Sequence, residues 1–221
     1  MPLWLAPNLI TLLGLVCILI NVATILVLVP DLIGPGPPWM YWSFVVGLWI
    51  YSTLDNVDGK QARRTGSSSP LGELFDHGKP RPPIVLCKYQ YPPFPVVAVL
   101  RLGIDSLNCP LGGIVMVAAC GYGSTPLGLF TVLIPCVTMF LSSWEQYHTG
   151  TLYLGYFNGP CEGIIIACTI MSISAIYGPE FYHQKAVDIV GWPFQNSSLM
   201  VSDLFVGMCL WAFFAVHMPA W

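Results

Sequence analysis

The chain has 221 residues, only 9% of them charged and 55% hydrophobic, and its mean hydropathy is +0.69. About a quarter of the residues of a soluble globular protein are charged, so this composition predicts a membrane protein. The net charge of −3 excludes the extended basic surface that a nucleic-acid-binding protein needs, and we expect no nucleic acid among the partners.

The first two predicted elements are apolar helices that cross the membrane. Residues 9–29 form an uncharged run of 21 residues, and a bilayer-spanning helix needs about 20. No basic segment precedes this run, which argues against a cleaved signal peptide. Residues 39–54 form the second predicted span, which opens with aromatic residues typical of a membrane interface.

Acidic residues follow the second span directly, at a membrane border where an unpaired carboxylate is costly. Asp55 and Asp58 are three residues apart, so a helix places them on one face. Joined by Asp76 from a neighbouring helix, they would form an all-oxygen site suited to Mg²⁺ or Mn²⁺ and a phosphate-bearing substrate.

The residues around these acids suit a nucleotide. The small residues Gly59, Ala62 and Gly72 would let it approach the backbone, and Arg63 could hold a phosphate. Seven of the eight basic residues lie between Lys60 and Arg101, and this bias predicts that the segment faces the cytosol.

Residues 79–103 break the pattern. These 25 residues hold four of the eight basic residues and six prolines, a mixture that suits neither a spanning helix nor a packed core. We expect an inserted loop.

Four further apolar runs follow it, at residues 106–123, 125–143, 163–178 and 199–217, which brings the predicted spans to six. The eight cysteines are scattered without a CxxC pair and are predicted to pack rather than to form disulfides or a zinc site.

The spacing of the acids resembles the signature of the CDP-alcohol phosphatidyltransferase family, DxxDGxxAR(x8)G(x3)D(x3)D. The chain reads Asp55-x2-Asp58-Gly59-x2-Ala62-Arg63-x8-Gly72-x3-Asp76, which meets seven of the eight fixed positions. Residues 59–78, 4–11 and 144–152 are similar to the eukaryotic choline/ethanolamine phosphotransferase branch. The resemblance therefore spans nearly the whole chain outside residues 79–103, as one membrane domain over residues 1–221 that is truncated at both ends relative to the family.

The resemblance implies an all-α integral membrane core of about six helices. It implies transfer of phosphocholine or phosphoethanolamine from CDP-choline or CDP-ethanolamine to diacylglycerol, with release of CMP. The expected location is the endoplasmic reticulum or Golgi bilayer, and a homodimer is a possible assembly. It implies that Asp55, Asp58, Asp76 and Asp105 hold Mg²⁺ or Mn²⁺, and that the CDP site is lined by Asn8, Gly59, Ala62, Arg63 and Gly72.

Two candidates exist for the base that takes the lipid hydroxyl proton. The choline/ethanolamine branch implies His77 acting with an acid that aligns with Glu162, whereas the wider family implies the last signature acid, here Asp105. We favour His77, because an imidazole titrates near working pH and a carboxylate beside metal ions stays weakly basic.

The last acid of the signature should stand at position 80, where the chain has Pro80. Without residues 79–103, Gly78 would precede Ile104 and Asp105 would restore the spacing, at i+4 from Asp76. One explanation is an intron retained in the coding sequence. The other is a genuine isoform whose loop bulges out, since the cost of closing a loop grows slowly with its length.

Two alternative functions stay open. A catalytically inactive membrane subunit of such an enzyme could also carry an interrupted signature. So could an isoform whose sequence was read from an incorrect gene structure. A cation transporter is disfavoured, because the acids cluster at one border and do not line a path across the bilayer.

Overall fold

The computed structural model describes residues 7–64, 96–149, 162–190 and 198–217. Over these ranges the chain is helical, with one isolated bridge between Lys185 and Met200. The long helices are α1 (Pro7–Leu28), α2 (Pro38–Arg64), α4 (Val96–Cys120), α5 (Pro126–Thr149), α6 (Ile164–Tyr177) and α8 (Val201–His217). The short ones are the 3-10 helix η2 (Pro179–His183) and α7 (Ala186–Val190). The all-α prediction is confirmed for the described residues.

Each of the six predicted spans corresponds to one long helix, but the helices differ in how well they suit a membrane. Within the described ranges, α1 alone is both long and apolar enough to cross a bilayer, with a mean hydropathy of 2.7 over Leu9–Leu28. Shorter apolar stretches lie in α4, α5, α6 and α8. The number of helices that cross the membrane therefore stays a prediction.

Two helix boundaries differ from the sequence-based expectation. Helix α2 continues ten residues past the end of the predicted span at position 54, and it carries Asp55 and Asp58 as their spacing predicted. Helix α4 begins at Val96, directly after the last of the six prolines, and includes residues 96–103 of the expected loop. The loop expectation is wrong for these eight residues, because they contain no proline to interrupt a helix. Residues 79–95 lie outside the described residues.

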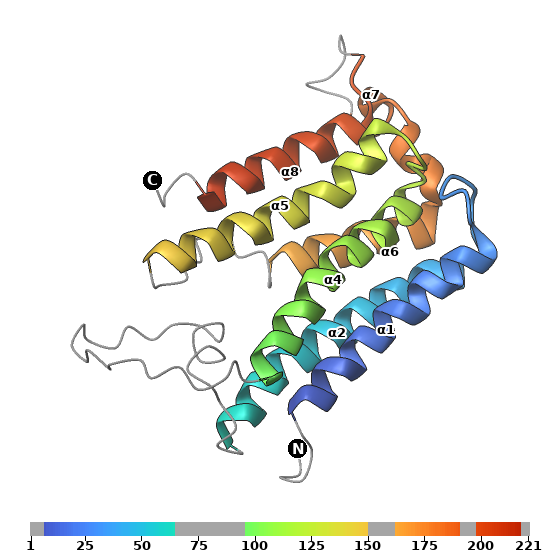
Figure 1. The fold of residues 1–221 in the computed structure, drawn as a ribbon. Helices are drawn as coiled ribbons and strands as arrows, with labels where there is room; N and C mark the ends of the chain where they lie inside the picture. Colours follow the sequence, from blue (N-terminus) through green and yellow to red (C-terminus); the bar gives the residue numbers. More distant parts are fainter. Residues whose placement is uncertain (1–6, 65–95, 150–161, 191–197, 218–221) are drawn as a thin grey trace.

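Helices α1 and α2 form an antiparallel pair joined by residues 29–37, with α4 packed on α1 and α6 on α2 (Figure 1). Their shared core includes Ile25 of α1, Phe44 of α2, Ala118 of α4 and Met171 of α6. The small Ala118 lets the helices approach closely. We call the end of the bundle at residues 29–37, 121–125 and η2 the far end. The opposite end, where α1 and α4 begin and α2 ends, is the polar end.

The far end is closed by aromatic packing. Tyr122 makes edge-on contacts with Tyr182 and His183, with ring centroids 6.4 and 5.9 Å apart, and also contacts Phe205 of α8. Burial raises the pKa of Tyr182, which lies in η2, above the usual value for a phenol. This side chain therefore stays protonated at neutral pH, and its hydroxyl donates to the Ile170 carbonyl.

Candidate functional site

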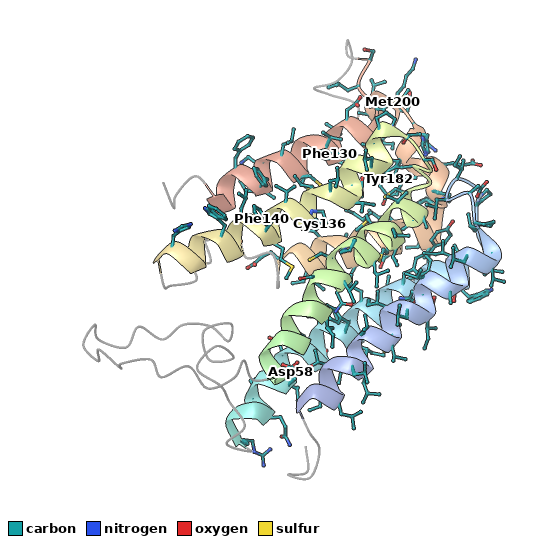
Figure 2. All side chains as sticks on the ribbon, viewed as in Figure 1. Asp58, Phe130, Cys136, Phe140, Tyr182 and Met200 are labelled. Atoms are coloured by element: carbon teal, nitrogen blue, oxygen red, sulfur yellow. The ribbon has the colours of Figure 1, made fainter. Side chains whose placement is uncertain are left out.

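The polar end is organised around a buried carboxylate. Asp58 lies on α2 and is 0% exposed. Its Oδ2 accepts a hydrogen bond from Thr11 Oγ1 of α1 at 2.5 Å. A buried charge is stable only when it is hydrogen-bonded, paired or coordinated to a cation, so this contact is part of what holds Asp58 in place. Figure 2 shows Asp58 where the ends of α1, α2 and α4 meet.

The predicted face of α2 forms as expected. Asp55 lies one turn before Asp58 and is half-buried, and Gln61 lies one turn after it and is 2% exposed. The spacing of three residues aligns the three side chains along one side of the helix. Two carboxylates and an amide thus follow each other on the side of α2 that faces the bundle.

The remaining signature residues are placed by backbone or lie outside the described ranges. Gly59, Ala62 and Arg63 belong to the last two turns of α2, and Asn8 stands one turn before Thr11 on α1. The spacing of three residues puts Asn8 on the same face of α1 as Thr11. Gly72, Asp76 and His77 are outside the described residues, and their predicted roles stay predictions.

Helix α4 brings a second polar segment to the same end. Asp105 lies on α4 nine residues after Val96, and its side chain is outside the described set. Asn108, one turn further on, is 6% exposed, and both its amide nitrogen and its amide oxygen are buried without a hydrogen-bond partner. Glu162 precedes α6 and is half-buried. Since α6 runs antiparallel to α2, with Cys168 against Val45, Glu162 lies roughly level with the middle of α2.

The residues present fit a divalent cation by the chemistry of their donors. Mg²⁺ and Mn²⁺ prefer oxygen ligands, and Asp55 and Asp58 offer carboxylates one helical turn apart with one of them fully buried. In the described part of the chain, no group of three or more His, Cys, Asp or Glu side chains is close enough to hold a metal. Two of the four predicted ligands, Asp76 and Asp105, have side chains outside that part.

Three polar residues of this end were not predicted: Thr11, Gln61 and Asn108. Thr11 follows Asn8 by three residues and Gln61 follows Asp58 by three, so helical spacing alone could have indicated both. Asn108 stands in the same relation to Asp105. None of the three is a fixed position of the signature, which explains why motif matching passed over them.

Comparison with known proteins identifies the family that this part of the chain resembles. Residues 4–78 match the family model described as CDP-alcohol phosphatidyltransferase. The chain is 41% identical over 185 residues to cholinephosphotransferase 1 of Saccharomyces cerevisiae, covering 83% of this chain and 41% of that protein. It is 36% identical over 219 residues to choline/ethanolaminephosphotransferase 2 of Arabidopsis thaliana, covering 96% of this chain and 48% of that protein.

These matches define a helical protein with a CDP-alcohol phosphatidyltransferase signature. Residues 4–78 therefore carry a CDP-alcohol phosphatidyltransferase domain, and most of the chain is similar to choline/ethanolaminephosphotransferases. It spans less than half the length of the curated relatives cited above. The family match ends at residue 78, immediately before the predicted insertion.

Proposed function

We propose that the chain transfers phosphocholine or phosphoethanolamine from a CDP-alcohol to diacylglycerol and releases CMP. The observation that carries this proposal is the buried Asp58, held by Thr11 on the face of α2 that also bears Asp55. A carboxylate is costly to bury, and a site for a cation and a pyrophosphate gives it a reason to be there.

The proposed reaction is a displacement at phosphorus. The diacylglycerol hydroxyl oxygen forms a bond to the phosphorus of the phosphoalcohol, the bond from that phosphorus to the bridging oxygen breaks, and CMP leaves with the bond's electrons. The hydroxyl proton passes to His77, supported by Glu162, or in the alternative assignment to Asp105. Mg²⁺ or Mn²⁺ bound by Asp55, Asp58, Asp76 and Asp105 would neutralise charge on the pyrophosphate.

The remaining residues hold the substrate in place. Gly59 and Ala62 leave room beside α2 for the nucleotide, Arg63 pairs with a phosphate, and Asn8 and Gly72 complete the CDP site. The exposed apolar side chains of α1, among them Ile20, Leu26 and Val27, fit a bilayer around the helix. We place the protein in the endoplasmic reticulum or Golgi membrane with the polar end towards the cytosol, and with a homodimer as a further possibility.

The test uses membranes that contain the chain but lack other enzymes of this type. Labelled CDP-choline or CDP-ethanolamine, diacylglycerol and Mg²⁺ are expected to give a labelled phospholipid. Asp58→Asn should reduce product at least about a hundredfold, because the amide is neutral and a poorer ligand for a hard cation. Asp31→Asn is the matched control, since it makes the same chemical change at the far end, where the Asp31 Oδ1 accepts from backbone amides of the turn. Full activity of Asp58→Asn would refute the assignment.

One observation favours a second candidate, a catalytically inactive membrane subunit. Helix α4 is continuous from Val96 through Asp105, so Arg101 occupies the place one turn before Asp105. The family signature has an acid four residues before its last acid. In this chain Asp76 would have that spacing to Asp105 if residues 79–103 were absent. Co-purification with an active homologue without turnover would support this candidate, and turnover by the isolated chain would exclude it.

A further inference from the structure

Asn108 is a buried polar group that the proposed chemistry has not yet used. Its side chain is 6% exposed, and neither of its amide heavy atoms has a hydrogen-bond partner. Leaving a buried amide without hydrogen bonds is costly, because the group has lost its water partners, so most proteins avoid it. A binding site whose ligand would complete the hydrogen bonds accounts for this cost.

The face of α4 that carries Asn108 is directed at the interior of the bundle and away from α5. The next residue, Cys109, contacts Met139 of α5, with the two sulfur atoms 3.2 Å apart. Asn108 is rotated from Cys109 by about 100° around the helix. Val115, two turns further along the same face, is part of the core shared with α1, α2 and α6. Asn108 thus faces the side of the bundle that holds Asp58.

Space adjoins Asn108 on this face. Gly112 lies one turn after Asn108, and a Cβ atom added to it would meet no described atom within 4 Å. Gly113, directed towards α5, is the opposite case, because a Cβ there would lie 2.8 Å from Val132 Cα. The open side of α4 is therefore the side that carries the unpaired amide.

The level of Asn108 along the helix identifies the kind of ligand. It lies three residues, about 4.5 Å, beyond Asp105 in the direction of the apolar core, and seven residues, about 10 Å, before Val115. It therefore stands between the predicted metal site and the apolar interior. The charged CDP half of the reaction approaches from the polar end, whereas a lipid acceptor reaches the acids from the apolar side.

We propose that Asn108 binds the acceptor lipid, its Oδ1 accepting from the free hydroxyl of diacylglycerol and its Nδ2 donating to a neighbouring ester carbonyl. This inference rests on the proposed transfer reaction, which supplies the lipid alcohol. An amide is suited to the task because it offers an acceptor and a donor side by side, which is what a hydroxyl next to an ester requires. Asn108 would then be a specificity-determining residue for the acceptor.

The test is Asn108→Leu, which keeps the size of the side chain and removes both hydrogen-bonding atoms. The KM for diacylglycerol in mixed micelles should rise at least about tenfold, the effect of losing two hydrogen bonds of ordinary strength, while the KM for the CDP-alcohol stays within about twofold. The unmodified chain should prefer a diester lipid to its dialkyl ether analogue, and the variant should lose this preference. The thermal midpoint should stay unchanged or rise, because an unpaired amide is removed.

Thr131→Val is the matched control, since it also removes a buried polar group without changing the size of the side chain. The Thr131 hydroxyl donates to the Leu127 carbonyl within α5, so its hydrogen bond is already made inside that helix. It should leave both KM values unchanged. If Asn108→Leu does not accumulate, Asn108→Ala replaces it. Equal changes in both KM values, or an unchanged KM for diacylglycerol, would overturn the inference. Binding of labelled dioctanoylglycerol to the purified chain is measured in parallel. If the variant loses this binding, the role of Asn108 is upheld. If the unmodified chain binds the lipid but shows no turnover, the transfer reaction is refuted while the role of Asn108 stands.

Discussion

The hydrogen bond between Thr11 and Asp58 joins the first two helices at the point where the chemistry is expected. The two residues are 47 positions apart in the sequence, and both are buried. By donating to one carboxylate oxygen, the threonine hydroxyl fixes the orientation of the whole carboxylate. Thr11 is therefore a positioning residue, whose effect on the reaction passes through Asp58.

Replacing Thr11 by valine should reduce turnover while the chain stays folded. A hydrogen bond to a charged group contributes about 1.5–3 kcal/mol, which corresponds to roughly a 10- to 100-fold loss. The loss should be accompanied by a higher Mg²⁺ concentration for half-maximal activity, which is measured by titrating the metal in the transfer assay. Thr11→Ser keeps the hydroxyl and should restore most of the activity. If valine and serine behave alike, the hydroxyl does not position Asp58.

Sequence spacing identified the residues of this site that have fixed places in a motif. The shared face of Asp55 and Asp58 follows from helical periodicity alone, and the structure confirms it. The hydrogen bond of Thr11 to Asp58 could not be predicted, because it depends on the relative position of α1 and α2 along their axes. The unpaired amide of Asn108 is a property of packing, and no local pattern in the sequence reports it.

Among the helices, α4 and α5 are held together by a close approach at one glycine. A Cβ atom at Gly113 would lie 2.8 Å from Val132 Cα, which is backbone and cannot rotate away. Small residues at a helix interface allow such contact, and α4 packs along α5 as a result. The neighbouring Gly112 has no such contact.

Gly113→Ala should therefore destabilise the protein by about 1–3 kcal/mol, the usual cost of overpacking. Gly112→Ala should be neutral or stabilising by up to about 1 kcal/mol, because alanine favours the helix and meets no described atom there. Thermal unfolding in detergent measures both, with a shift of about 2–4 °C for each kcal/mol in a chain of this size. Equal midpoints for the two variants would contradict the close packing of α4 on α5.

The ends of the helices show what local sequence could and could not decide. The apolar runs located all six long helices of the described ranges, because burial in a bundle or a bilayer demands apolar side chains. Hydropathy did not indicate that α2 continues to Arg64, since its last turns carry charged and polar residues. Residues 96–103 were assigned to a loop together with their basic and proline-rich neighbours, although they form the beginning of α4.

For the whole molecule, the arrangement of the helices explains how one end can carry a charged reaction. The long helices expose many large apolar side chains, and three of the buried polar residues, Asp58, Gln61 and Asn108, lie towards one end. The far end is filled by aromatic side chains, among them Tyr122 and Tyr182. The acids Asp55 and Asp58 lie at the polar end, which is where the proposed lipid and charged substrates would meet.

Removing residues 79–103 should raise the activity of the molecule. The deletion joins Gly78 to Ile104 and places Asp76 one turn before Asp105 on a continuous helix, where the present chain has Arg101. Replacing a cation by a carboxylate beside the acids predicted to bind metal should favour binding of Mg²⁺, and we expect at least about a tenfold higher rate of phospholipid formation per mole of protein. A shorter deletion, of residues 79–95, is the matched control. It removes all six prolines but keeps Arg101 in place, so it should give no such gain. Equal rates for the two deletions would mean that loop length, rather than the spacing of the acids, limits the site, and no gain from either would remove the case for an interrupted signature.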